Sequence, residues 1–109
     1  MATFFRNKVV KEIGTTDEVA LTTDGATRST VIGLSLANLT EYPIYASVKV
    51  VDDASVAGFY LKEVMIPAES SLRALSAGEK LVLAPDNQLL INSNQPESLD
   101  AVISYVDIV

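Results

Sequence analysis

The side chains most able to do chemistry in this sequence are carboxylates in short polar stretches. Asp52 and Asp53 are adjacent, and Asp24, Asp86 or Asp100 could join them around a calcium ion, which takes oxygen ligands. The regular spacing of a calcium-binding loop does not occur, and nothing selects one pair of carboxylates for glycoside hydrolysis. Acidic loop residues in an acidic chain are ordinarily solvated. We therefore expect no metal site, no cofactor and no catalytic pair.

Histidine and cysteine are both missing from the 109 residues. Histidine is the commonest general base and metal ligand, and cysteine would supply a nucleophile or a disulfide. The serine–histidine and cysteine–histidine mechanisms are therefore excluded within this chain. Because 49% of the residues are apolar, the chain can bury a core without disulfides. We expect a protein that is not an enzyme.

Tyrosines near predicted loops are the residues that could bind a sugar. Tyr42 and Tyr45 flank a turn, and Tyr60 follows a loop. A tyrosine ring offers a flat apolar face and a polar tip, which suits a sugar ring, although packing at the rim of a core is the commoner role. The absence of tryptophan weakens the sugar interpretation.

The charge distribution is uneven along the chain. The net charge is −6, which argues against a nucleic-acid partner. Residues 1–11 nevertheless carry Arg6, Lys8 and Lys11 and no acid. On a strand, Arg6 and Lys8 share one face and Lys11 points to the other. Two interpretations stay open: a strand whose cations face water, or an assembly arm that binds an acidic surface of a neighbouring subunit.

The elements that would position these residues are short β-strands. Apolar and polar side chains alternate with a period of two, no sustained helical period occurs, and turn-forming residues recur roughly every eight to twelve residues. This pattern predicts one domain, residues 1–109, folded as an all-β antiparallel β-sandwich of about nine strands, either jelly-roll or immunoglobulin-like. The expected strands are residues 4–13, 18–23, two within 28–51, 59–66, 71–75, 79–83, 88–92 and 99–109.

The stretch 30–51 is expected to form a β-hairpin at the centre of the fold. Asp24-Gly25 before it is typical of a two-residue hairpin turn, and Ala77-Gly78 of another turn. Gly33 indicates a bulge or the close approach of another chain. The strand 99–109 is apolar on both faces, so it should lie centrally in a sheet or be covered by a partner. The expected core includes Ile32, Leu34, Val48, Leu83 and Ile103.

The sequence shows no targeting or membrane-spanning segment. The start lacks the apolar run of a signal peptide, and no apolar stretch approaches the roughly 18 residues of a span. We expect a protein that stays in solution and has no membrane partner.

Four segments carry a resemblance that extends over most of the chain: FFRNKVVKEIG, STVIGLSLANLT, MIPAESSLRALSAGEKLVLAP and SLDAVISYVDIV. They resemble small β-sandwich virion proteins of tailed bacteriophages, of the marine and cyanobacterial phage type. The resemblance implies a capsid decoration or cement subunit, made in the host cytoplasm and residing in the virion. Its partners would be the major capsid protein or neighbouring structural subunits, and it would be a homo-oligomer, for example a trimer. The alternative is a fibre- or baseplate-associated module that binds a host-surface glycan.

Overall fold

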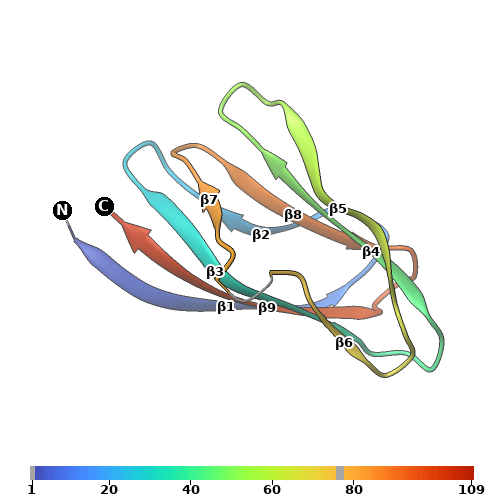
Figure 1. Ribbon diagram of the computed structural model, residues 1–109. Helices are drawn as coiled ribbons and strands as arrows, with labels where there is room; N and C mark the ends of the chain where they lie inside the picture. The colour runs from blue at the N-terminus through green and yellow to red at the C-terminus, as the bar shows by residue number, and fades with distance from the viewer. Residues whose placement is uncertain (1, 76–77) are drawn as a thin grey trace.

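The computed structural model describes residues 2–75 and 78–109, and these form an all-β sandwich with two antiparallel sheets packed face to face (Figure 1). This confirms the predicted fold class. Ala77, in one expected turn, lies outside the described residues. The nine strands are β1 (Thr3–Ile13), β2 (Glu18–Thr22), β3 (Arg28–Asn38), β4 (Ile44–Val51), β5 (Ala57–Ile66), β6 (Ser71–Arg73), β7 (Leu81–Leu83), β8 (Gln88–Ser93) and β9 (Leu99–Ile108).

The order of the strands is that of a jelly roll. Sheet A has the order β1-β9-β3-β6, with β7 also paired to β3, and sheet B has the order β2-β8-β4-β5. The chain passes from one sheet to the other at most connections, so it wraps around a core that both sheets share. Of the two predicted sandwich types, the structure therefore has the jelly roll.

The predicted hairpin over residues 30–51 is wrong, because β3 lies in sheet A and β4 in sheet B. The buried side chain of Asn38 holds the crossing between them. Its amide Nδ2 donates to the main-chain oxygens of Tyr42, Ile66 and Pro67 over 2.7, 3.1 and 3.1 Å. Its Oδ1 accepts from the main-chain N–H of Thr40 over 2.8 Å. These hydrogen bonds attach the turn to the end of β5. The chain therefore crosses to sheet B and does not fold back along β3.

The two-residue hairpin predicted at Asp24-Gly25 is also wrong. These residues connect β2 in sheet B to β3 in sheet A. The Asp24 carboxylate accepts from the main-chain N–H of Ala26 over 2.9 Å, and the Asp24 carbonyl accepts from the N–H of Asp86 over 3.1 Å. The dipeptide marks a turn, as its residue types indicate, but the turn crosses between sheets.

The core between the sheets contains four of the five residues predicted to be buried: Leu34, Val48, Leu83 and Ile103. The fifth prediction is wrong, since Ile32 is 45% exposed. The β3–β9 register shifts between Val31 and Gly33, so Ile32 is the extra residue of a bulge and points outward. The bulge expected near Gly33 is thereby confirmed.

The strand β9 lies between β1 and β3, which confirms the central position as one of its two predicted settings. The loop between β6 and β7 reaches across to sheet B, where the Tyr60 hydroxyl on β5 hydrogen-bonds to the Glu79 carboxylate. The described residues contain no helix of the length and hydropathy that a membrane span requires.

Candidate functional site

The strand β1 is the edge strand of sheet A. It pairs with β9 from Thr3 to Ile13, and no described strand pairs with its other side. The main-chain N–H and C=O groups along that side are therefore available to another strand. The predicted assembly arm, residues 1–11, contains most of this edge strand. From Thr3 onward its residues are part of sheet A.

The three N-terminal cations lie on this edge but do not form one basic stripe. Arg6 and Lys8 pair with Tyr105 and Ile103 on β9 and lie on one face, as alternation predicts. Arg6 Nε donates to Asp107 Oδ2 over 3.0 Å. Lys11 falls where the register shifts, so its direction does not follow from simple alternation. All three side chains are exposed.

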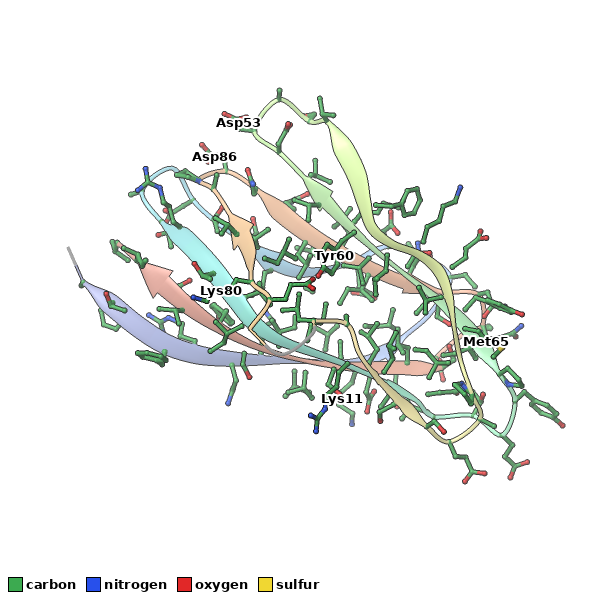
Figure 2. All side chains as sticks on the ribbon, viewed as in Figure 1. Lys11, Asp53, Tyr60, Met65, Lys80 and Asp86 are labelled. Atoms are coloured by element: carbon green, nitrogen blue, oxygen red, sulfur yellow. The ribbon has the colours of Figure 1, made fainter. Side chains whose placement is uncertain are left out.

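The three tyrosines singled out from the sequence lie in different places. Tyr42 is exposed in the turn between β3 and β4. Tyr60 is half-buried, packs against the core and bonds to Glu79, near the middle of the view in Figure 2. Tyr45 lies on the outer face of sheet B and lines a groove. Only Tyr45 is therefore placed to stack on a ligand in that groove.

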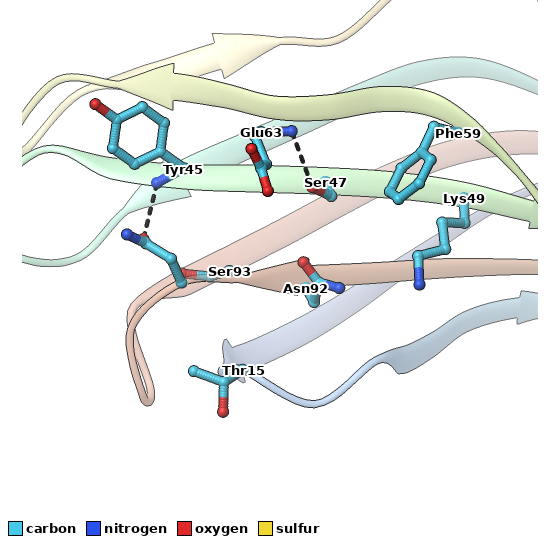
Figure 3. A pocket seen from close by; sticks show the side chains of 9 residues that line it. Thr15, Tyr45, Ser47, Lys49, Phe59, Glu63, Asn92 and Ser93 are labelled. Carbon is cyan, nitrogen blue, oxygen red and sulfur yellow. Dashed lines mark hydrogen bonds between the residues drawn. The ribbon is translucent and has the colours of Figure 1, made fainter.

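The groove on the outer face of sheet B is open and has a volume of about 580 Å³ (Figure 3). Tyr45 stands at one end and Phe59 at the other, with Ser47 and Asn92 between them. Glu63 lies on the same face with a φ of 50°, a backbone conformation that is costly for glutamate. Sequence reasoning missed Phe59, Glu63 and Asn92, because only the sheet order places β5 and β8 beside β4.

The positive charge in the groove, that of Lys49, is already paired with a carboxylate. Lys49 Nζ lies 2.9 Å from Asp17 Oδ2, and Asn92 Nδ2 donates to Asp17 Oδ1 over 2.5 Å. The Lys49 hydrogen bond is the main reason that the pKa of Asp17 is lowered. The ammonium groups of Lys49 and Lys62 lie 5.3 and 5.4 Å from the centroid of the Phe59 ring. The Phe59 ring is thus occupied by cations, and Tyr45 offers the freer aromatic face.

Three of the carboxylates considered for a calcium site, those of Asp24, Asp52 and Asp100, accept hydrogen bonds from main-chain N–H groups. Asp53 and Asp86 lie at the same end of the sandwich (Figure 2). Asp52 Oδ1 accepts from the N–H groups of Ala54 and Val56, both over 2.9 Å. The pKa of Asp24 is lowered, chiefly by its hydrogen bond from the Ala26 N–H. Within residues 2–75 and 78–109, no group of three or more acidic side chains is arranged to hold a metal ion.

Comparisons with known proteins identify a shared fold and no family. No protein-family model and no curated protein matches the sequence. A structure of disulfide-linked pili, the endospore appendages of Bacillus, has a TM-score of 0.58 at 5% identity, over 98% of this chain and 88% of that one. An acid-stable capsid of a Helicobacter pylori bacteriophage gives 0.52 at 8% identity, over 100% and 89%. Infectious bursal disease virus gives 0.50 at 7% identity, over 98% of this chain and 32% of that one. The chain is therefore similar in fold to proteins of a pilus and of two viral particles.

Proposed function

We propose that this protein is a non-enzymatic structural subunit of a bacteriophage particle, specifically a capsid decoration or cement subunit. The observation that carries the proposal is the jelly roll, which matches a bacteriophage capsid chain over the whole of this chain and 89% of that one. The pilus match over a similar share supports it. Both kinds of structure are built from repeated subunits, whose contacts use exposed strand edges and faces.

In this proposal the edge strand β1 makes the contact with the particle. A strand of a neighbouring subunit pairs with the free side of β1, and the main-chain hydrogen bonds supply affinity. Arg6, Lys8 and Lys11 lie against acidic groups of that neighbour, and charge complementarity fixes the register. The partner is the major capsid protein or an adjacent structural subunit, and a symmetric homo-oligomer such as a trimer presents several such edges at once.

The proposal is tested on particles of the phage that encodes the protein. Mass spectrometry of purified particles is expected to find the chain in a fixed, multiple-copy ratio to the major capsid protein. Purified protein is expected to bind particles that lack it and to raise the temperature at which they release DNA. If the chain is absent from particles, or if it binds them without any effect on their stability, the decoration role is wrong.

A second candidate function is favoured by the groove on sheet B: a fibre- or baseplate-associated module that binds a host-surface glycan. Tyr45 supplies an aromatic face, and Glu63 and Asn92 supply polar groups beside it. This function predicts binding to host envelope polysaccharide that Tyr45→Ala abolishes and Tyr42→Ala leaves unchanged. The decoration function predicts the reverse preference, with binding to particles and none to envelope.

A further inference from the structure

The outer face of sheet A is formed by the side chains that point away from sheet B, and its central part carries little charge. The strand register places its residues in rows across β1, β9, β3 and the short strands β6 and β7. Its three central rows are Phe5–Val106–Thr30–Val82, Asn7–Ser104–Gly33 and Val9–Val102–Ser35–Arg73.

Large apolar side chains on this face are open to solvent. Phe5 is 80% exposed, and Val9, Ile32, Val82 and Val102 are each at least 45% exposed. Val9 and Val102 are neighbours in one row and Phe5 and Val106 in another, and the row Asn7–Ser104–Gly33 lies between them. Exposed apolar side chains gathered on one face of a sheet favour a surface that a partner covers.

The same face differs in charge from the rest of the chain. Arg73 is the only charged residue in the three central rows, although the chain has 14 acidic residues and a net charge of −6. Two copies that met through most other surfaces would bring acidic groups together. In the three central rows two copies can approach without acid–acid contact, and Asp100 and Arg28 lie beyond these rows at the two ends of the face, so self-association is least opposed at its centre.

Gly33 has no side chain and so leaves the middle of the face hollow, although its backbone conformation does not require glycine. Its φ is outside the left-handed region, and a Cβ added there would lie 3.6 Å from the Ser104 Cβ, an ordinary contact. Depressions of about 640 and 390 Å³ lie on either side and share Ile32 and Ser104 in their linings. The face is therefore shaped to receive protruding side chains such as Phe5.

We propose that the outer face of sheet A binds a second copy of this chain, sheet against sheet, about a two-fold axis. At about 3.3 Å per residue the ten residues of β9 span about 33 Å, and four strands about 4.8 Å apart span about 19 Å. The face thus offers roughly 600 Å² per copy, which reaches the lower end of the range for specific interfaces. The contact makes the homo-oligomer of the proposed function a two-fold dimer rather than a trimer, leaves the free side of β1 open, and can be tested without any particle.

The first test compares two valine-to-arginine variants by sedimentation equilibrium. Val102 is central in the proposed interface and 45% exposed, and Val19 is 47% exposed on the outer side of sheet B. The unaltered protein is expected to form dimers reversibly with rising concentration. Val102→Arg buries an unpaired charge and should raise the dissociation constant by about tenfold or more. Val19→Arg should leave it unchanged, and thermal melting confirms that both variants fold.

The second test uses the absence of cysteine from the sequence. Ser104→Cys places one thiol in the middle row, and Asn92→Cys places one on the outer face of sheet B. Because facing sheets pack about 10 Å apart, a bis-maleimide of similar reach should link copies of Ser104→Cys much faster than copies of Asn92→Cys.

Three results overturn the proposal. The unaltered protein could remain monomeric at every concentration at which it stays dissolved. Val102→Arg and Val19→Arg could dimerise equally well. The dimer could be lost only when Lys8 on β1 is reversed to glutamate, which would assign the contact to the strand edge. None of these results bears on whether the protein binds particles, so the failure of this inference is distinct from the failure of the proposed function.

Discussion

At the scale of single residues, Ile32 and Leu34 show how one inserted residue changes burial. They stand two positions apart on β3, yet their exposures are 45% and 3%. Leu34→Ala is therefore expected to lower the free energy of unfolding by about 2–5 kcal/mol, because it leaves a cavity in the core. Ile32→Ala should change it by less than about 0.5 kcal/mol. Urea unfolding of both variants measures this difference, and equal losses would show that the bulge is misplaced.

Asp17 gives the protein a definite response to acid. Its pKa is lowered from 3.8, first by the hydrogen bond from Lys49 and also by that from Asn92, while burial opposes them. A carboxylate with a lowered pKa in the folded state stabilises the fold above its unfolded pKa, and the gain is lost as the pH falls through the folded value. The contribution is below about 1 kcal/mol because the pair is partly exposed.

Asp17→Asn is accordingly expected to lose stability near neutral pH and to show a flatter fall in stability below pH 3.8. Lys49→Met removes the hydrogen bond that lowers the pKa of Asp17 most, so it should flatten the fall in stability over the same pH range. Thermal melting across this pH range measures the effect. An unchanged slope in Lys49→Met would contradict the assigned cause.

Asn38, the last residue of β3, holds the connection to β4 through its side-chain hydrogen bonds, so its replacement is expected to lower the free energy of unfolding. Asn38→Ala would leave the carbonyls of Ile66 and Pro67 without this donor and would free the turn that leads to β4. The expected loss of unfolding free energy is about 1–3 kcal/mol. Asn94→Ala, which removes a single exposed acceptor for the Tyr45 N–H, is the matched control and should cost less. A smaller loss for Asn38→Ala than for Asn94→Ala would be inconsistent with this role.

At the scale of elements, the strand β1 belongs to sheet A on one side and makes the proposed contact with the particle on the other. Deleting residues 1–11 removes most of the pairing with β9 and the partly buried Val10, but leaves the buried Ile13. We expect the shortened chain to fold with reduced stability and to lose binding to particles. Circular dichroism and co-sedimentation with particles measure the two outcomes. Failure to fold would make β1 part of the core and end the arm interpretation.

Charge reversal on β1 tests the electrostatic part of the same proposal. Lys8→Glu is cleaner than Arg6→Glu, because Arg6 pairs with Asp107 and its reversal would also disturb the strand locally. Lys8→Glu should weaken particle binding most at low salt, where exposed charges are least screened. Lys80→Glu, the same charge change at an exposed site between β6 and β7, is the control. Equal effects of the two variants would assign the loss to net charge.

At the scale of the whole molecule, the jelly roll predicts slow folding. Among the described strands, β4 and β5 are the only neighbours in sequence that pair with each other, whereas β1 pairs with β9 and β2 with β8. Distant segments must meet before most hydrogen bonds form, so refolding should take milliseconds to seconds. Stopped-flow tyrosine fluorescence can follow it, since the chain has four tyrosines and no tryptophan. Complete refolding in microseconds would argue against this topology.

The sequence predicted the class of fold and most strand positions, because alternation with a period of two depends only on which face of a strand is buried. It predicted neither the crossing after Asn38 nor that at Asp24-Gly25, because alternation says nothing about which strand is the partner. It identified the cations on β1 from their types alone. It could not predict that Phe59 and Asn92 line the same groove as Tyr45, since the pairing of β5 and β8 with β4 brings these strands together.

The sequence by itself determined which chemistry this protein lacks, because a chain without histidine or cysteine has neither of those groups in any fold. It also determined that the chain forms strands with a buried side. Only the tertiary structure decided which surfaces face outward together. Phe5, Val82 and Val102 are far apart in sequence, and they share one face because β1, β9, β3 and β7 lie side by side in sheet A. A bulge of one residue then placed Ile32 on that face, since a shift by one position exchanges the two sides of a strand.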